Sequence, residues 1–305
     1  MTEYETIKNH QGLFDFSLEG KISVKGDGSV EFLNGLVSND LVHLKEEQGI
    51  SAAFLNKFGQ IIADCFIYRR KTGFLIFLPI AQKQKIFEKL RKESTLVNCV
   101  VEDLSMQYGL FSLQGKEAKT YLEKFFQIKL DENREILRKK IAFLVFRRKR
   151  SSVESFDIMF PALHYQEFLK ELALKKNSAE VYEILRLEAG IPLMGIDFDE
   201  KTMLLEIGEE AVSFTKGCYV GQEVIARVKN LAKGITAKKL VRLEIEGKEN
   251  FVKSTEINSA NQKIGFITSA TYSPGLQKVV ALGFITKGFY DKKTVEVCGK
   301  KGLII

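Results

Sequence analysis

The feature that most constrains the fold of this chain is the irregular order of its strand-like and helix-like segments. Residues 20–25 alternate as a strand does, residues 81–94 are amphipathic with helical spacing, and residues 141–146 again favour a strand. Strict alternation of strands and helices would predict a doubly wound parallel sheet, whereas this mixed order predicts an α+β fold. With 305 residues, the chain is long enough for about two domains and needs no disulfide or metal to stabilise its core.

Turn signals refine this expectation in the first two thirds of the chain. Residues 52–55 and 60–68 predict two strands joined by a hairpin turn at 56–59. The glycine-containing turn at 26–29 is expected to supply the N-cap of the helix that follows it. Further strands are expected at 74–78, 97–103, 108–113 and 155–160, and helices at 30–37, 118–125, 161–174 and 179–189.

The chain changes character near residue 235. From there it consists of short β-rich runs separated by glycine and proline, at 239–246, 262–268, 279–286 and 294–297. Such runs predict a small antiparallel β-barrel. We therefore divide the chain into an N-terminal α+β domain at 1–105, a second α+β domain at 106–232 and a β-barrel domain at 233–305.

Composition excludes several classes of protein. The longest apolar run, residues 73–81, is too short to cross a membrane, and residues 1–16 lack the pattern of a signal peptide. Because no two cysteines form a CxxC pair and only three histidines are present, a zinc site built from close pairs is not expected. We therefore predict a cytoplasmic protein with free thiols, no membrane association and no metal site.

The net charge of +7 is compatible with an anionic partner such as tRNA. The basic runs at 69–71, 138–140 and 147–150 are short and scattered, and surplus lysine often serves only solubility. No RRM, KH or zinc-finger signature accompanies these runs. Binding of tRNA or another polyanion is therefore the third and last of our functional hypotheses.

The most informative segment is Lys-Gly-Cys-Tyr-Val-Gly-Gln-Glu at residues 216–223. Gly217 and Gly221 let the backbone turn tightly and approach a ligand closely. A helix is expected to begin after Gly221, and its free N–H groups, together with Lys216, would favour a thiolate at Cys218. Such a thiolate is suited to be a nucleophile, a redox group or a cluster ligand, and the alternative is a buried structural cysteine.

This segment resembles the signature of the YgfZ family, which comprises folate-binding relatives of the glycine-cleavage T-protein. Residues 26–40, 186–197 and 264–274 resemble further stretches of that family, in the same order. The resemblance implies a T-protein-like ring of three domains around a central cavity that binds tetrahydrofolate. In such relatives the first two domains interleave along the chain, and a small antiparallel β-barrel lies at the C-terminal end.

The resemblance also implies a function. We expect a folate-binding accessory factor for iron–sulfur cluster assembly or repair, with Cys218 as the essential thiol. Its partners would be iron–sulfur enzymes, including those that modify tRNA, or cluster-assembly proteins. The alternative is an enzyme, a folate-dependent aminomethyltransferase or demethylase. The sequence leaves open whether the protein catalyses a reaction.

Asp64 is the second candidate catalytic residue beside Cys218. Alternation along the strand places its carboxyl group on one face with Ile62, Phe66 and Tyr68. A carboxylate among apolar neighbours tends to have a raised pKa and can act as a general base. By resemblance, Asp64 falls where T-protein relatives place a catalytic Asp beside the folate amines. The alternative is an Asp at a strand edge that is solvated or paired with Arg69.

The remaining candidates would bind the cofactor. By resemblance, Glu188 would accept hydrogen bonds from the pterin ring, unless it pairs with Arg186 or another basic group. Arg227 would pair either with the glutamate tail of folate or with Glu223 one turn earlier. Tyr219 would stack on the ligand or fill the core. Lys216, Gly217 and Gly221 complete the predicted cofactor-binding set.

Overall fold

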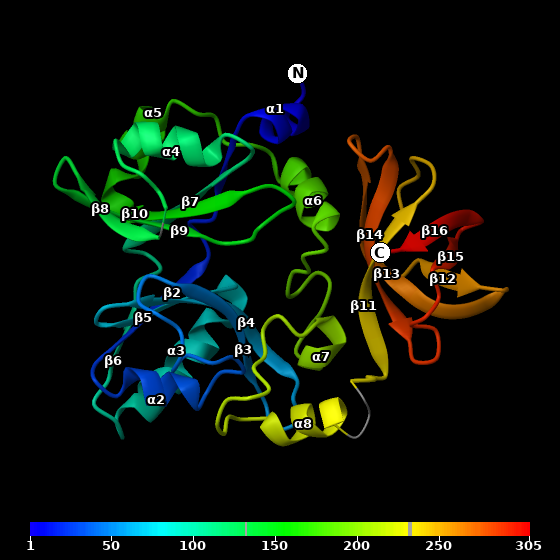
Figure 1. The fold of residues 1–305 in the computed structure, drawn as a ribbon, viewed down its shortest axis with the longest axis horizontal. Coiled ribbons are helices and arrows are strands. Elements are labelled where there is room, and N and C mark those ends of the chain that lie inside the picture. The colour runs from blue at the N-terminus through cyan, green and yellow to red at the C-terminus, as the bar shows by residue number, and fades with distance from the viewer. Residues whose placement is uncertain (132, 231–233) are drawn as a thin grey trace. The chain divides into compact units, whose positions relative to one another are not determined.

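The computed structural model describes residues 1–131, 133–230 and 234–305, which fold into two compact units (Figure 1). Unit 1 comprises Met1–Phe54, Ile62–Ser178 and Ala211–Tyr219, and unit 2 comprises Leu55–Ile61, Ala179–Glu210 and Val220–Ile305. The domain limit that we predicted at residues 232–233 lies outside the described residues.

Unit 1 is built around two antiparallel sheets. The first has the strand order β3-β4-β5-β2-β6, with the strands β2 (Gly20–Lys25), β3 (Gly49–Leu55), β4 (Ile61–Arg70), β5 (Gly73–Leu78) and β6 (Val100–Asp103). The second has the order β1-β7-β10-β9-β8, with the strands β1 (Gly12–Asp15), β7 (Tyr108–Gln114), β8 (Arg134–Arg138), β9 (Ile141–Arg147) and β10 (Ser155–Pro161). The N-terminal strand β1 therefore joins a sheet that is otherwise built from residues 108–161.

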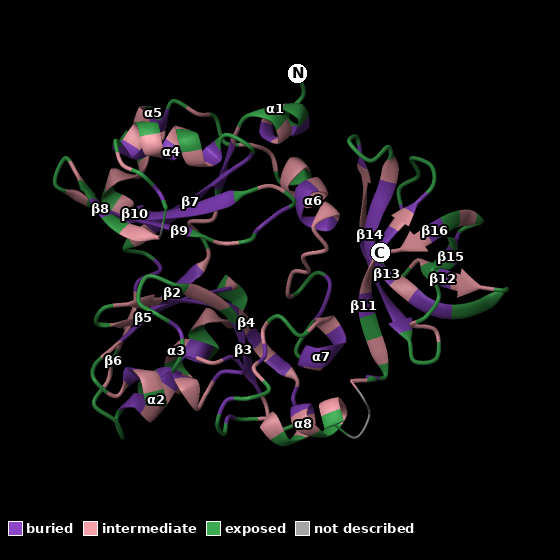
Figure 2. Cartoon of the chain, viewed as in Figure 1, coloured by how far each residue is buried: buried purple, intermediate pink, exposed green. Residues whose placement is uncertain are grey.

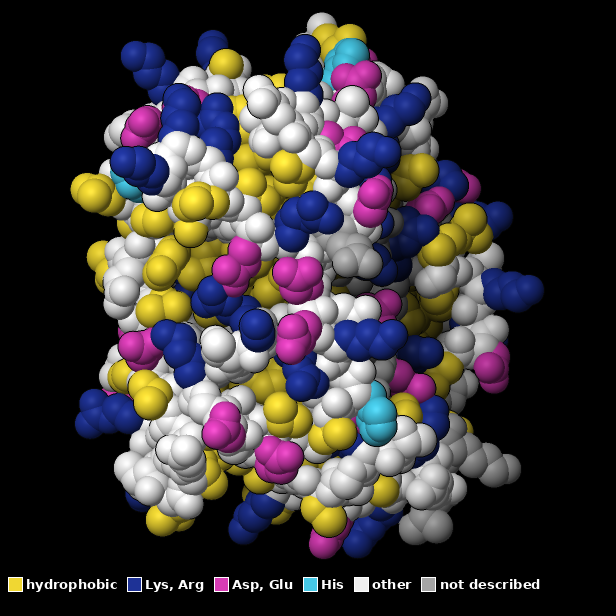
Figure 3. All heavy atoms as spheres, turned by 60° about the vertical axis from the view of Figure 1, so that its left-hand side comes forward, with side chains coloured by type: hydrophobic (Ala, Val, Ile, Leu, Met, Phe, Trp, Pro, Cys, Tyr) yellow, Lys and Arg dark blue, Asp and Glu magenta, His cyan; other side chains and the backbone are white. Residues whose placement is uncertain are grey.

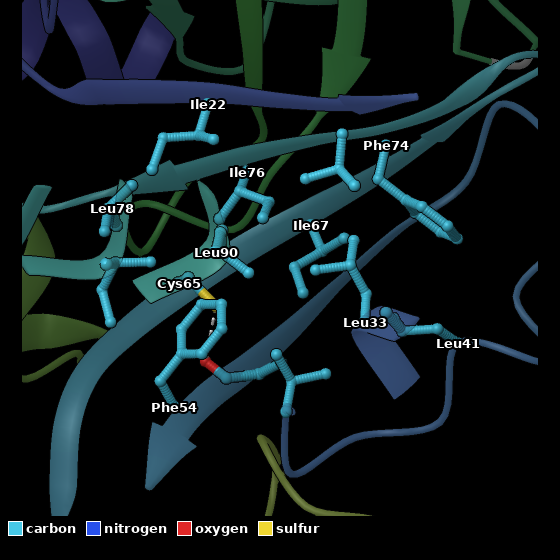
Figure 4. Packing of buried hydrophobic residues seen from close by; sticks show 14 of the residues in the cluster. Ile22, Leu33, Leu41, Phe54, Cys65, Ile67, Phe74, Ile76, Leu78 and Leu90 are labelled. Atoms are coloured by element: carbon cyan, nitrogen blue, oxygen red, sulfur yellow. Dashed lines mark hydrogen bonds between the residues drawn. The ribbon is translucent and has the colours of Figure 1, made fainter. Parts of the chain in front are cut away.

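Helices cover the outer faces of both sheets, so that unit 1 has four layers (Figure 1). The helices of unit 1 are α1 (Glu3–Asn9), α2 (Ser29–Asn34), α3 (Ile80–Ser94), α4 (Ala118–Phe126) and α5 (Tyr165–Leu172). Helices α2 and α3 pack on the first sheet, where Leu33 and Leu90 meet Cys65 and Ile67 of β4 in one core (Figure 4). Inner strands such as β10 are buried along their length, whereas edge strands such as β6 are not (Figure 2).

The two sheets meet through aromatic rings. Phe146 of β9 packs against Phe66, Tyr68 and Phe77, with ring centroids 5.1 to 5.7 Å apart. Offset and tilted aromatic pairs at such distances add to the free energy gained by burying the rings. Because Phe66 and Tyr68 lie on one face of β4, Asp64 lies on that face too, toward the second sheet.

Unit 2 contains the predicted β-barrel. It is closed, with the strand order β11-β14-β13-β12-β15-β16. Its strands are β11 (Lys238–Ile245), β12 (Glu256–Ser259), β13 (Gln262–Ser273), β14 (Lys278–Thr286), β15 (Thr294–Val297) and β16 (Lys300–Ile304). The helices of unit 2 are α6 (Ala179–Glu188), α7 (Leu204–Ile207) and α8 (Gln222–Asn230).

The strands and helices that we predicted are confirmed, with three kinds of correction. Strands β1, β8, β12 and β16 and helices α1 and α7 were not foreseen, because short segments carry few periodic positions. The predicted N-cap hydrogen bond at 26–29 is also absent, since the capping position of α2 is Gly28, which has no side chain to accept one. A 3-10 turn at Ala162–His164 replaces the first turn of the helix expected at 161–174.

A buried ion pair joins helix α6 to the barrel within unit 2. The Arg186 guanidinium is fully buried and donates from Nη1 to Asp197 Oδ2 at 2.9 Å. Asp197 Oδ1 accepts from Thr268 and Ser269, both at 2.6 Å. An irregular register between Ile267 and Ser269 of β13 allows two successive side chains to reach the same carboxylate. Glu183 also binds Arg186, so the guanidinium is paired on two sides.

We expect Asp197→Asn to lower the free energy of unfolding by about 3 kcal/mol, because it leaves a buried guanidinium without its closest buried counter-charge. Urea denaturation at pH 7, with a probe in unit 2, measures this loss. Asp291→Asn removes the same charge at an exposed position of unit 2 and should change stability little. Equal stability of the two variants would contradict the assignment.

Candidate functional site

Asp64 lies in β4, an inner strand of the first sheet, and its side chain is half-buried. Its Oδ1 atom is buried, and no hydrogen-bond partner for it is found in the described parts of the chain. Burial raises the pKa of Asp64 to about 6, although the positive charge of Arg148 opposes the rise. The residue therefore changes its protonation state near neutral pH.

Neither alternative that we kept open for Asp64 holds. The residue is not at a sheet edge, because β4 has β3 on one side and β5 on the other. It does not pair with Arg69 either, since Arg69 Nη1 donates to the carbonyl oxygens of Leu41, Val42 and Leu44. Phe66 and Tyr68 share its face as predicted, whereas Ile62 packs against the core on the other side of the sheet.

An ionic cluster in unit 1 provides the electrostatic surroundings of Asp64. Arg148 binds Glu19 through both terminal nitrogens, at 2.9 and 2.8 Å. Arg150 bridges Glu19 and the buried carboxylate of Asp157. Burial would raise the pKa of Glu19, but the attraction of Arg148 and Arg150 outweighs it and lowers the pKa to about 2.

Sequence reasoning missed this cluster because it interpreted residues 147–150 as a solvated basic run. Arg148 and Arg150 are only 16% and 6% exposed, and both are paired with acids. The signal was present in the sequence, since Phe146 and Arg148 continue the alternation of β9 onto the face where Phe66 lies. The run at 147–150 therefore does not support a polyanion-binding surface.

The Cys218 segment has mixed exposure. Helix α8 begins at Gln222, as predicted, and the Cys218 side chain is a free, exposed thiol. Tyr219 is 8% exposed, and its ring centroid lies 4.9 Å from Lys216 Nζ. Burial raises the pKa of the Tyr219 hydroxyl to about 12. Of the two roles left open for Tyr219, this burial favours the one in the core.

The Lys216 ammonium group is bound by backbone carbonyl groups. Its Nζ donates to the carbonyl oxygens of Asn34, Val37 and Asn39 at 2.6, 2.7 and 2.8 Å. An ammonium group has three N–H donors, so all of them are used by the backbone. Burial lowers the pKa of Lys216 to about 8.

Packing requires glycine at position 221 but not at position 217. Gly221 has a φ of +85°, and a Cβ there would lie 2.6 Å from the carbonyl oxygen of Asn56. Close approach of the hairpin turn at 56–59 therefore demands glycine at this position within unit 2. Around Gly217 the structure leaves open space for a side chain, so local packing sets no such demand.

Glu188 and Arg227 both lie in unit 2. Glu188 ends helix α6, is half-buried and accepts a hydrogen bond from Ser273 Oγ at 2.6 Å. Arg186 itself is bound by Glu183 and Asp197, and the pairing of Glu188 with a basic group stays a prediction. Arg227 is exposed on α8, and among the described residues no ion pair joins it to Glu223.

The buried Oδ1 atom of Asp64 shows whether the residues of this chain suit a folate. A buried acceptor without a donor costs about 1–3 kcal/mol, and a ligand that brings an N–H group would remove that cost. Asp64 Oδ1 is such an acceptor, and Tyr68 presents a second buried oxygen with no partner in the described chain. The residues of unit 1 therefore fit a ligand that offers amine hydrogens.

Comparisons with known proteins establish the family. The model of the GCVT N-terminal domain matches residues 1–216, and that of the glycine cleavage T-protein C-terminal barrel domain matches residues 238–302. The chain belongs to the glycine cleavage T-protein family. Its fold is the T-protein fold, with mixed α and β content and a closed antiparallel β-barrel of six strands.

Relatives of this T-protein family member span almost the whole chain. An aminomethyltransferase of Thermoanaerobacter sp. (strain X514) is 30% identical over 300 residues, which cover 93% of this chain and 81% of the relative. The aminomethyltransferase of Thermotoga maritima is 27% identical over 298 residues, with 93% and 81% covered. The crystal structure of glycine cleavage system aminomethyltransferase T from Bartonella henselae has a TM-score of 0.87 at 23% identity, covering 99% of this chain and 87% of that one.

Within residues 1–131, 133–230 and 234–305, no three side chains of His, Cys, Asp or Glu gather as a metal site would require. None of the helices described in the structure is long and apolar enough to span a membrane.

We expect Asp64→Asn to become more stable relative to the unchanged protein as pH rises. The pKa of Asp64 is raised from 3.8 to about 6 in the folded state, so folded protein holds this proton more tightly than unfolded chain does. The stability of the unchanged protein therefore falls as pH rises between these values, by about 1–2 kcal/mol. Urea denaturation of both proteins at pH 4 and pH 7.5 measures the difference.

The matched control is Asp27→Asn, which removes the same charge at an exposed position of unit 1. Its stability difference from the unchanged protein should show no comparable rise over this pH window. A pH-independent effect of Asp64→Asn would mean that Asp64 titrates in the folded protein as it does in the unfolded chain.

Proposed function

We propose that this chain binds tetrahydrofolate and uses Asp64 to move a proton during one-carbon transfer from an aminomethyl donor. The relatives named above are aminomethyltransferases, which supports this reading over an accessory role in iron–sulfur assembly. The observation that carries the proposal is the Asp64 carboxyl group, whose Oδ1 has no partner among the described residues and whose pKa burial raises to about 6.

Each residue has a defined role in this proposal. Tetrahydrofolate, when bound, would supply the amine nitrogens that accept the one-carbon unit, and the amino group of the aminomethyl donor would leave as ammonia. Above pH 6 the Asp64 carboxylate is mostly ionised and can accept a proton from an N–H group that reaches Oδ1. The resemblance gives Glu188 and Arg227 of unit 2 the roles of binding the pterin and the glutamate tail of folate, and these roles stay predictions.

The second candidate function is support of iron–sulfur enzymes in the cytoplasm, including enzymes that modify tRNA. Its supporting observation is the exposure of the Cys218 thiol in the Lys-Gly-Cys-Tyr-Val-Gly-Gln-Glu segment, which resembles the YgfZ signature. A purely structural cysteine would be buried, as Cys65 is. One thiol cannot hold a cluster alone, so a partner protein would have to supply the other ligands.

The third hypothesis, binding of tRNA or another polyanion, receives less support. On the face shown in Figure 3, acidic and basic side chains are interspersed, and no continuous basic area is seen among the residues described there. Surface charge of mixed sign is expected of an ordinary soluble surface rather than of a phosphate-binding track.

We expect purified protein to form methylenetetrahydrofolate from tetrahydrofolate and an aminomethyl donor, with a rate that falls below about pH 6 as Asp64 becomes protonated. Asp64→Asn should lower the rate at pH 7.5 by about 100-fold or more, because general-base catalysis contributes that much. Absorbance of the folate product measures the rate.

Calorimetric titration with tetrahydrofolate is the control for binding. Asp27→Asn should bind and react like the unchanged protein, while Asp64→Asn should bind more weakly, by about 10-fold for one lost charge-assisted hydrogen bond. Saturable binding with no transfer from any aminomethyl donor would refute the transferase proposal and leave a folate-binding accessory role. No binding at all would refute both folate roles.

We expect Cys218→Ala to reduce iron–sulfur enzyme activity in a strain that lacks this protein, if the second candidate function is correct. Cys298→Ala is the matched control, because Cys298 is also a free and exposed thiol but lies in the barrel of unit 2. Full restoration by Cys218→Ala would remove the second candidate function. Activity of aconitase-type and tRNA-modifying enzymes in extracts provides the measurement.

A further inference from the structure

A segment without helix or strand carries Cys218, and it is fastened at defined points. Residues 211–219, which we call the Cys218 loop, belong to unit 1 although their neighbours in sequence on both sides belong to unit 2. The loop contacts residues 34–39, which follow directly from helix α2. Its position therefore depends on a few contacts rather than on regular secondary structure.

We propose that Lys216 and Ser38 are positioning residues that fasten the Cys218 loop to residues 34–39, and that the Lys216 ammonium acts as an anchor and not as an activator of the thiol. This inference goes beyond the transferase proposal. For the second candidate function, support of iron–sulfur enzymes, it explains how the loop that carries the Cys218 thiol is held in place. The experiment below reports on the loop itself, so its outcome is separate from that of either functional test.

Lys216 supplies the first fastening. Its three hydrogen bonds to the carbonyl oxygens of Asn34, Val37 and Asn39 join parts of the chain that are 177 to 182 residues apart. Asn34 is the last residue of α2, and the carbonyl groups at a helix C-terminus attract a cation. Lys216 is 7% exposed, so these bonds are shielded from water.

Ser38 supplies the second fastening. Its hydroxyl donates to the carbonyl oxygen of Ala211 and accepts from the backbone N–H of Ala53 at 2.9 Å. Its own carbonyl oxygen accepts from the N–H of Ser213 at 3.0 Å. Ser38 is fully buried and therefore joins strand β3 to the beginning of the Cys218 loop.

The same geometry argues against activation of the thiol. With all three N–H groups of Lys216 committed to carbonyl oxygens, none is left to donate to the sulfur of Cys218. The Tyr219 ring lies against the same ammonium, at 4.9 Å. Lys216 and Tyr219 are buried, while Cys218 in the stretch between them is exposed.

The test combines hydrogen exchange with alkylation of the full chain at pH 7. We compare the unchanged protein with Lys216→Met and Ser38→Ala. Amide exchange in peptides covering residues 211–219 should become at least about tenfold faster in both variants, since loss of a fastening favours local opening. Peptides from the barrel strands β13 and β14 should exchange at unchanged rates.

Alkylation of Cys218 distinguishes a Lys216 that only anchors the loop from a Lys216 that activates the thiol. Anionic iodoacetate and neutral iodoacetamide are compared at Cys218 by mass spectrometry, with exposed Cys298 as an internal reference. The control variant is Lys71→Met, which removes an exposed lysine of unit 1. If Lys216 is only an anchor, the ratio of the iodoacetate rate to the iodoacetamide rate at Cys218 is the same in Lys216→Met and Lys71→Met. A several-fold fall of this ratio in Lys216→Met alone would show that the ammonium acts on the thiol and would overturn the proposal.

Unchanged exchange of residues 211–219 in both variants would overturn it as well. If Lys216→Met does not fold, Ser38→Ala carries the test, because it removes a fastening without changing any charge. Faster exchange confined to the loop in Ser38→Ala supports the proposal, and exchange equal to that of the unchanged protein refutes it.

Discussion

The compensation of buried charge between Arg148, Glu19, Arg150 and Asp157 is the interaction on which the candidate site depends. Each guanidinium is bound to at least one carboxylate, so neither is free to form a full salt bridge with Asp64. Burial raises the pKa of Asp64 and outweighs the opposing effect of Arg148, and the negative charge of Glu19 adds to the rise. A chain with an unpaired arginine at this place would hold Asp64 permanently ionised. The balanced cluster instead leaves an acid that can gain and lose a proton near neutral pH.

In each of the motifs at residues 186–197 and 216–223, some charged side chains are buried and paired, whereas a neighbouring side chain stays accessible. In residues 186–197, Arg186 and Asp197 are buried against each other and close the segment on the barrel, while Glu188 remains half-buried beside Ser273. In residues 216–223, Lys216 is buried and Cys218 is exposed. A buried charge costs much free energy unless it is fully paired, and in both motifs the pairing fixes the backbone that presents the neighbouring side chain.

Much of the fold could be predicted from periodicity. The hairpin at 52–68, the helix at 81–94 and the barrel runs after residue 235 were expected, because apolar positions repeat there at the spacing of a strand or a helix. The short strands β1, β8, β12 and β16 were missed, since segments of four or five residues form strands mainly through pairing with a neighbour. The face of Asp64 was predicted correctly, but its charged neighbours were not.

The sequence by itself determined the relationship to the T-protein family, the order of most elements and the face of β4 on which Asp64 lies, because these depend on local spacing and on matched motifs. Only the tertiary structure decided which charges are paired. Glu19 and Arg148 are 129 residues apart, and Lys216 reaches carbonyl groups at residues 34–39. Such pairs leave no periodic trace in the sequence, since the partners meet only after the sheets and helices between them have packed. The pKa of Asp64 and the role of Lys216 therefore follow from packing, which a basic run or a lone motif cannot reveal.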